Sequence, residues 1–489
     1  MLGRRRPVFW LGVALFVPSL CAPAAAENIA RIQADVVEVD FDGEQTHAAG
    51  NARLTYGDFE ISADELTADR VTGHVAAIGG LRLRQGERQL RGRALEYNMR
   101  TEEGVLTEAR AAEQGIIIRG ERITFSPREL VAHHAHFTTC NRPDPHYSFG
   151  AERITLTAQE TDYGGPPESG RLSLNRARVS YRGRTLFTLP RYSVSVGRLR
   201  EPGGAPVPIT GFSREDGPYA VISYSLAPPD DRTIANFSYR YTTYRGIRGH
   251  VQVGRYLGPA ELSLQYVRRE DSADRELRAD EVETSLADVM INRSPEYGLR
   301  LPGLALGPSL RVRGEWLRGS YSEAFAGEQF ARATADRSSA TLLAYTVPYT
   351  LSPAITVSHA FGWRRASYDP GDEFRVRFYS HTADLEFGPR GRLSLSYVAR
   401  HGSGATPFLF DGIGPERELL GDVRWWVNPR WRLRLVELCD LKAREVRDMI
   451  LEVTRTVHCL DYTIGWRKSR GALYLGIGLA PTTADWSDD

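Results

Sequence analysis

The chain has few cysteines, almost no net charge and no long hydrophobic run, and each absence narrows the classes of protein it can be. Only 4 of its 489 residues are cysteine, and 62 basic residues balance 61 acidic ones to a net charge of +1. This balance argues against a nucleic-acid-binding protein, which normally carries a basic surface. Beyond the N-terminus no apolar run reaches the roughly 18 residues of a membrane-spanning helix, so we expect no helical anchor.

The motifs of common enzymes are also missing. The chain contains no Gly-x-Ser-x-Gly elbow, no P-loop and no His-Glu-x-x-His motif. The nearest approach to a metal site is a group of histidines and one cysteine, namely His133, His134, His136, Cys140 and His146. No carboxylate or second cysteine stands at supporting spacing. We therefore expect no enzyme, no metal centre and no cofactor.

The first 26 residues have the features of a secretory signal peptide. Arg4, Arg5 and Arg6 precede an apolar stretch from Val8 to Leu20, and 24–26 offers an Ala-x-Ala cleavage site. A transmembrane helix is the alternative, but the apolar stretch is too short to span a bilayer comfortably and contains a proline. The mature chain is then expected in an oxidising compartment, where cysteines can pair.

A repeat follows the signal peptide. Phrases that end in a charged residue recur at Asp35, Asp64, Arg93 and Glu121, at steps of 29, 29 and 28 residues, and a further copy ends near Glu152. A fixed period of this length is typical of units that bury their apolar faces only by stacking on their neighbours. Apolar and polar residues alternate with period two between Gly-rich breaks, which predicts β-strands. The pattern leaves open a β-solenoid or a long β-jelly roll.

The second half of the chain predicts longer strands with one apolar or aromatic face. Leu262, Leu264 and Tyr266 alternate with polar residues, and 473–479 continues the pattern near the C-terminus. A soluble sandwich buries such a face, whereas a transmembrane barrel turns it to lipid and keeps polar residues in the lumen. Bulky charged residues on the polar face, and aromatic residues near strand ends such as Trp425 and Trp426, favour the barrel.

These patterns predict an all-β chain in four parts. They are the signal peptide (1–26), a β-repeat domain (27–165), an antiparallel transmembrane barrel (171–480) and a short acidic tail (481–489). The boundary is placed at the Gly- and Pro-rich stretch near residue 165, because seven of the eight tryptophans lie beyond residue 300. The length of the second part gives about 14 strands.

Several segments of the chain resemble the LptD/OstA family of outer-membrane lipopolysaccharide-assembly proteins. The resemblance rests on 49–51 (Ala-Gly-Asn), 135–140 (Ala-His-Phe-Thr-Thr-Cys), 143–154, 175–179, 189–192, 211–219 and 458–463 (His-Cys-Leu-Asp-Tyr-Thr). Compared with the well-known members, the barrel is much shorter, an N-terminal cysteine is missing, and one late cysteine replaces an adjacent pair. The resemblance therefore identifies a shortened or divergent member.

The resemblance implies a transport function in the outer membrane, with the N-terminal domain in the periplasm. It implies that the repeat domain (27–165) is a periplasmic β-jelly roll and that the barrel (171–480) lies in the outer membrane. Lipopolysaccharide would pass along an apolar groove of the jelly roll into a barrel that opens laterally to the outer-membrane lipid. The implied partners are a periplasmic LptA-like bridge protein and an LptE-like lipoprotein plug. Two alternatives remain open from the residues: a passive porin or adhesin with a β-repeat domain, and a soluble β-repeat scaffold.

Under this hypothesis the groove is lined by apolar residues of the repeat. They are Leu54, Ile61, Leu66, Ile78, Leu81, Leu83, Leu90, Leu95, Leu106, Ile118 and Ile123. The alternative is that these side chains only fill the core of their own domain.

The resemblance also assigns a gate and a disulfide. Pro206 and Pro208 lie near the expected first barrel strand, where proline removes a ladder hydrogen bond and weakens a seam; the alternative is a Pro-rich loop. A bond between Cys140 and Cys459 would tie the periplasmic domain to the last strands. Pairing of Cys439 with Cys459, or three free thiols, are the alternatives.

Overall fold

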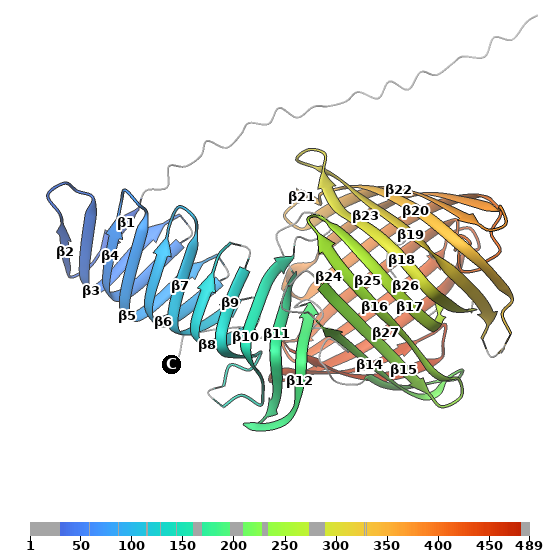
Figure 1. Ribbon diagram of the computed structural model, residues 1–489, viewed down its shortest axis with the longest axis horizontal. Helices are drawn as coiled ribbons and strands as arrows, with labels where there is room; N and C mark the ends of the chain where they lie inside the picture. The colour runs from blue at the N-terminus through green and yellow to red at the C-terminus, as the bar shows by residue number, and fades with distance from the viewer. Residues whose placement is uncertain are drawn as a thin grey trace, which may run out of the picture.

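The protein consists almost entirely of antiparallel strands arranged in two sheets. The computed structural model describes residues 30–480 except 58, 87, 114–115, 128, 143, 160–168, 196–208, 227–232, 273–288, 327 and 329. The expected signal peptide, the acidic tail and the two prolines of the expected gate lie outside the described residues. Within them no helix is long and apolar enough to cross a membrane. Figure 1 shows a row of stacked hairpins that leads to the end of a barrel.

The N-terminal sheet contains the first twelve strands of the described chain. Its order is β1-β3-β4-β5-β6-β7-β8-β9-β10-β11-β12, with β2 also paired to β3. The strands are β1 (Arg31–Gln33), β2 (Val36–Val39), β3 (Gln45–Tyr56), β4 (Phe59–Asp69), β5 (His74–Gln85), β6 (Arg88–Asn98), β7 (Glu103–Glu113), β8 (Ile116–Phe125), β9 (Glu129–Thr138), β10 (Tyr147–Gln159), β11 (Ser169–Tyr181) and β12 (Arg184–Ser195). Every pairing is antiparallel, so the fold is a β-jelly roll and not a parallel solenoid.

The repeat marks a bend in the middle of the strands, which we call the corner. The register shifts between Ala49 and Ala52 in β3, and again between Ile78 and Leu81 in β5, as in β-bulges. Asp35 packs at the first bend, where its amide donates to Gly50 O at 2.8 Å and Asn51 Nδ2 donates to its carboxylate at 2.9 Å. The charged residue of each repeat thus occupies the same position on successive hairpins.

The corner folds each strand into two halves whose ends meet at what we call the mouth. Phe59, at the start of β4, stacks on Tyr97, at the end of β6, with ring centroids 4.5 Å apart, and Tyr97 stacks on Phe125 at 5.9 Å. Across the same line Arg88 Nη1 donates to Ser126 O at 3.0 Å. The sheet therefore encloses an apolar interior between the corner on one side and this aromatic line on the other.

The predicted groove residues point into this interior with one exception. Ten of the eleven are at most 2% exposed and belong to one hydrophobic cluster. Ile78 is 57% exposed, so its assignment to the groove is wrong. The alternation itself explains the error: the inward residues Val75, Ala77, Leu81 and Leu83 are all separated by even steps, and Ile78 falls on the opposite face of the strand.

The second sheet closes into an antiparallel barrel. Its strands are β13 (Ile209–Ser213), β14 (Gly217–Leu226), β15 (Thr233–Thr242), β16 (Gly246–Leu257), β17 (Ala260–Asp271), β18 (Val289–Ala305), β19 (Leu310–Phe325), β20 (Ala333–Thr346), β21 (Tyr349–Ser352), β22 (Ile355–Tyr368), β23 (Glu373–Glu386), β24 (Gly391–Gly404), β25 (Arg417–Asn428), β26 (Trp431–Asp440), β27 (Glu445–Val457), β28 (Leu460–Arg467) and β29 (Ala472–Leu479), with a short 3₁₀ helix η3 (Gly388–Arg390) before β24.

Sixteen strands form the ring of the described chain, two more than predicted. The labels β13 to β29 number seventeen, but β20 and β21 both pair with β22. The short β21 therefore continues the line of β20 and is not a separate strand of the ring. The prediction of an all-β chain that ends in an antiparallel barrel is confirmed. An even number of strands is the rule for single-chain bacterial barrels.

The two faces of the barrel have opposite chemistry. Large apolar side chains are exposed on the outside, including Tyr266 at 52%, Phe361 at 56% and Leu475 at 53%. Charged pairs are buried in the lumen, such as Arg400 with Glu418 at 2.7 Å, whose side chains are 0% and 2% exposed. This is the inverse of a soluble sandwich and matches a wall that faces lipid.

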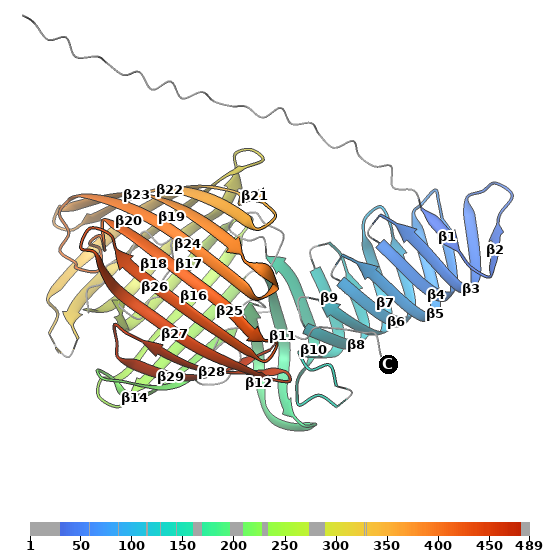
Figure 2. The ribbon, with the colours of Figure 1, turned by 180° about the vertical axis from the view of Figure 1, so that it is seen from behind.

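The domain boundary predicted near residue 165 falls between β10 and β11 of the N-terminal sheet. These strands pair directly, from Tyr147 with Tyr181 onward, and β12 follows β11 in the same sheet. The Gly- and Pro-rich stretch therefore connects two adjacent strands, and the barrel begins at β13. Figure 2 shows β10, β11 and β12 next to the barrel end that carries β28 and β29.

We predict that Gly50→Ala destabilises the N-terminal sheet. Gly50 has φ +75°, and an added Cβ would lie 2.5 Å from the Asp35 carboxylate at the corner. Gly43→Ala is the matched control, because it has a similar φ of +67° with nothing within 4 Å of the added atom. We expect Gly50→Ala to cost about 1–3 kcal/mol more than the control. Hydrogen exchange of β1–β4 in the full chain measures the difference, and equal losses in both variants would contradict the corner's steric role.

Candidate functional site at the junction of sheet and barrel

One apolar cluster connects the N-terminal sheet to the barrel. It runs from Ala48 in β3 to Tyr192 in β12 and includes two residues of the barrel, Cys459 and Leu479. A row of aromatic rings, Phe149, Tyr192 and Tyr224, crosses from β10 to the barrel strand β14 with centroid separations of 6.1 and 5.9 Å. The apolar interior of the sheet therefore continues without a polar break to the barrel wall.

The loop between β9 and β10 fixes the junction through buried hydrogen bonds. Thr138 Oγ1 donates to Tyr147 O at 2.7 Å, and the Thr139 amide donates to the Tyr147 hydroxyl at 3.1 Å. Thr139 Oγ1 also donates to the carbonyl of Cys459, at 3.4 Å, in the turn between β27 and β28. Burial raises the pKa of the Tyr147 phenol well above its usual value, so it stays a neutral donor. The Thr-Thr-Cys phrase thus docks the sheet on the barrel.

Two of the three cysteines in the described part of the chain meet at this junction. Cys140 and Cys459 are buried, at 0% and 2% exposure, whereas Cys439 lies in β26 and contacts Glu437. All three are free thiols in this structure. The bond between Cys140 and Cys459 therefore stays a prediction, while their approach across the junction is a feature of the fold.

Two histidines complete the group around these thiols. His146 Nδ1 lies 3.7 Å from Cys140 Sγ and 3.4 Å from Cys459 Sγ, and His458 Nδ1 lies 3.5 Å from Cys140 Sγ. The four ligand atoms all lie within 4.8 Å of one another. Burial, together with the Cys140 thiol, raises the pKa of Cys459 to about 12, and partial desolvation with nearby Arg142 lowers the pKa of His458. The family resemblance predicted that Cys140 and Cys459 meet, but nothing in the sequence indicated that His146 and His458 join them, because the two segments are more than 300 residues apart.

The other histidines of the sequence-based candidate group lie elsewhere. His133, His134 and His136 belong to β9, where His134 occupies the corner with φ +45°. In the described residues, none of the three belongs to a metal-like cluster. Cys140 and His146 are thus the only members of that group that the fold brings together.

The ring of the barrel is weakest where its first and last strands meet. β13 is five residues long and pairs with β29 over three positions, from Thr210 with Leu475 to Phe212 with Leu473. Neighbouring strands such as β28 and β29 pair over eight positions. The expected gate prolines lie just before β13, outside the described residues. Short pairing itself marks this seam as the easiest place to open the wall.

A segment between β24 and β25 folds into the barrel lumen. Its residue Asp411 is completely buried and accepts hydrogen bonds from Arg337 at 2.6 and 2.7 Å, from Arg364 at 3.0 Å and from the Tyr368 hydroxyl at 2.7 Å. Glu323, also buried, accepts from the backbone amides of the same segment at 3.1 and 2.9 Å. The segment thus narrows the lumen from inside the chain's own barrel.

The outer edge of the N-terminal sheet is open. All four residues of β2 are exposed, among them Val36 at 53% and Val39 at 58%, and the edge strands pair with β3 on one side. An exposed edge of this kind offers unpaired backbone groups to another strand.

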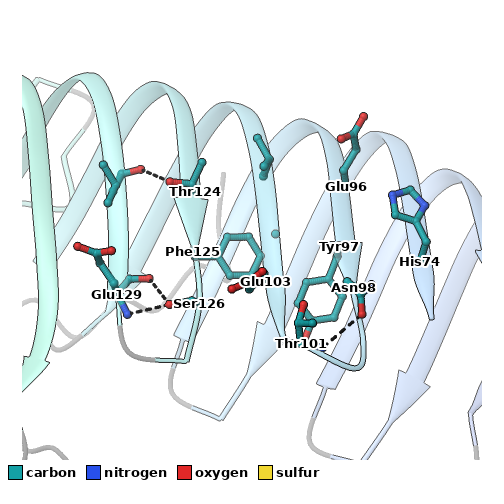
Figure 3. Close-up of a pocket in the computed structure, with 13 residues that line it drawn as sticks. His74, Glu96, Tyr97, Asn98, Thr101, Glu103, Thr124, Phe125, Ser126 and Glu129 are labelled. Atoms are coloured by element: carbon teal, nitrogen blue, oxygen red, sulfur yellow. Dashed lines mark hydrogen bonds between the residues drawn. The ribbon is translucent and has the colours of Figure 1, made fainter. Parts of the chain in front are cut away.

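A hollow of about 560 Å³ lies beside the mouth of the jelly roll. Figure 3 shows Tyr97 and Phe125 within it, near Glu96, Glu103 and Glu129. The acidic rim would repel phosphate groups, so we do not assign the hollow to a phosphorylated headgroup. The sequence analysis did not single out this place, because residues from five strands form it.

Comparison with known proteins gives a family-model match near the N-terminus and several relatives. Residues 31–129 match the family model described as LptA/(LptD N-terminal domain) LPS transport protein. An LPS-assembly protein LptD from Acidovorax sp. is 28% identical over 47% of this chain and 28% of its own length. The chain is thus similar to LptD-family proteins. A second relative, LPS-assembly protein LptD from Shewanella oneidensis, is 26% identical over 50% of this chain and 31% of its own length.

The matches to the family cover less than a third of the length of these relatives. Among solved structures, LptH from Pseudomonas aeruginosa, an LptA-homologous periplasmic component of a lipopolysaccharide transport device, matches 20% of this chain and 77% of its own, at 22% identity and a TM-score of 0.20.

We predict that Asp411→Asn releases the lumen segment. The substitution removes the carboxylate that two buried guanidinium groups share. Breaking a buried ion pair in this way lowers the free energy of unfolding by about 3–5 kcal/mol. The released segment should raise the ionic conductance of the reconstituted barrel. Glu416→Gln is the control, because Glu416 forms an exposed pair with Lys442 at 2.9 Å. Unchanged conductance in Asp411→Asn would show that the segment does not restrict the lumen.

Proposed function

We propose that the chain carries lipopolysaccharide across the periplasm–outer-membrane boundary and releases it into the outer membrane. The barrel would sit in that membrane, and the N-terminal sheet would extend into the periplasm. The single observation that carries the proposal is the unbroken apolar cluster from β3 to the barrel turn that holds Cys459. Acyl chains in such an interior gain about 0.8 kcal/mol for each methylene group removed from water.

The mouth offers the route by which a lipid enters the jelly roll. The strands are hydrogen-bonded to their neighbours along the whole row, but across the mouth the two halves are joined by ring stacking and a few hydrogen bonds. Separation of Phe59 from Tyr97 exposes the interior without breaking a strand pairing. Acyl chains would lie inside, and the sugar and phosphate groups would remain in water outside the mouth.

The exposed edge at β1 and β2 suits a donor with the same fold. A strand of an LptA-like bridge protein added there would continue the sheet and align the two apolar interiors. At the other end, the short pairing of β13 with β29 supports a lateral exit, since few backbone hydrogen bonds must break to open it. The lipid would then leave the junction sideways into the bilayer.

The alternative functions fit the structure less well. A passive porin needs an open aqueous lumen, whereas the segment around Asp411 enters this one. A soluble scaffold would not expose the outer apolar belt of the barrel. The same lumen segment occupies space that an LptE-like plug would need, so the plug stays a prediction of the resemblance.

We predict that photo-crosslinkers placed inside the jelly roll capture lipopolysaccharide. Leu83 and Ile118 are 1% exposed and face the interior, whereas the neighbouring Arg82 and Arg84 face outward. Crosslinkers at the first two positions should form adducts in growing cells, and those at the two arginines should not. Equal capture at all four positions, or none at the interior ones, would count against the groove.

We predict that locking the β13–β29 seam blocks release. Phe212 and Leu473 are register partners across the seam, so a disulfide between cysteines at both positions should hold it closed. Ile222 and Tyr239, register partners across β14 and β15, provide the matched control pair. Surface lipopolysaccharide should fall under oxidising conditions in the seam variant and recover on reduction. An equal effect of both locks, or no effect of either, would refute a gate at this seam.

A further inference from the structure

The four-residue group at the junction has the donor set and the spacing of a structural metal site. Two sulfurs and two imidazole nitrogens in tetrahedral arrangement are the ligands that select zinc among common ions. With usual bond lengths of 2.3 Å for sulfur and 2.0–2.1 Å for nitrogen, a tetrahedral ion sets its sulfur and nitrogen ligands about 3.5 Å apart. Three of the four separations between sulfur and nitrogen are 3.4, 3.5 and 3.7 Å, and all four ligand atoms lie within 4.8 Å of one another.

The geometry points to a Cys₂His₂ zinc site formed by Cys140, His146, His458 and Cys459, which fastens the N-terminal sheet to the barrel. This inference goes beyond the proposed transport and does not depend on it. Cys140 and His146 come from the loop before β10, and His458 and Cys459 come from the turn before β28. Each part supplies one sulfur and one nitrogen, so neither part holds the ion alone.

The surroundings of the group suit a closed structural site. The sulfurs lie on the buried side and His458 is exposed, which leaves a path for the ion from solvent. Binding would remove one proton from each thiol and release it to solvent, so two thiolates balance the charge of the ion. The threonine and tyrosine hydrogen bonds described above already hold the two segments in place.

Two contacts of Arg142 must change when the ion binds. Its Nε donates to His458 Nε2 at 3.2 Å, which requires the proton of that ring on Nδ1, and its Nη1 lies 3.5 Å from His146 Nε2. Coordination through Nδ1 moves that proton to Nε2, so the exposed Arg142 side chain turns away into solvent. A disulfide between the two cysteines is the competing arrangement, and it would leave both imidazoles without a function.

The test uses the full chain, extracted from membranes in detergent with free thiols alkylated at lysis. We expect about one zinc ion per chain by elemental analysis, and none in the Cys140→Ser/Cys459→Ser variant. His146→Ala and His458→Ala should each lower zinc affinity at least about tenfold, because mutating even the residues that only support a metal ligand lowers metal affinity by that factor. Cys439→Ser and His401→Ala, which alter a cysteine and a histidine outside the group, should keep the zinc.

Two further measurements separate the site from misfolding and from the disulfide. His458→Cys keeps a zinc ligand and should restore binding that His458→Ala loses, and cobalt in place of zinc should give the visible absorption of a tetrahedral thiolate complex. Intact mass with a Cys140–Cys459 disulfide and no zinc would overturn the proposal. Zinc binding that is indifferent to both histidines would also overturn it.

Discussion

The structure depends on one geometric constraint, the bend that every repeat of the N-terminal sheet places at mid-strand. Without it the sheet would be a flat ribbon with one exposed apolar face. With it, each strand folds back on itself, and Phe59 at one end of the strands meets Tyr97 from the opposite end across the mouth. The enclosed interior, its alignment from hairpin to hairpin and its continuation toward the barrel all follow from the same position in each repeat.

The barrel has the same alternation of apolar and polar residues, but with the apolar face turned outward. The N-terminal sheet turns its apolar residues inward because water surrounds it, and the barrel turns them outward because lipid is the better solvent for them. Charged residues that would be costly in a dry core pair with one another in the lumen, as Arg337 and Arg364 do around Asp411. The two sheets meet at the turn between β27 and β28, where the barrel carries buried apolar groups that pack against the interior of the N-terminal sheet.

The junction therefore carries both a mechanical and a transport role in our proposals. The loop before β10 and the turn before β28 hold the sheet against the barrel through Thr139, Tyr147 and the cysteine–histidine group. A firm attachment keeps the apolar interior aligned with the seam between β13 and β29. Because that seam is the shortest pairing in the described ring, a lipid that arrives at the junction meets the part of the wall that opens most easily.

The sequence by itself determined the all-β class, the repeat, the inward apolar residues and the barrel. Alternation with period two and a constant spacing are local properties, and burial follows from them wherever the strand is regular. It misplaced Ile78, because that residue is apolar in type but lies on the outward face of a strand whose inward residues alternate regularly around it. The strand number predicted from the sequence was also too low, because it was obtained from an average length per strand and turn, and the actual pairing of the strands is not visible in the sequence.

Only the tertiary structure brought together groups that lie far apart in the chain. His458 and Cys459 reach Cys140 and His146 because the barrel closes and returns its last strands to the start of the second sheet. The lumen segment, the mouth and the short seam arise in the same way. Each depends on long-range pairing, whose register is set by bulges and closure and not by any single stretch of sequence.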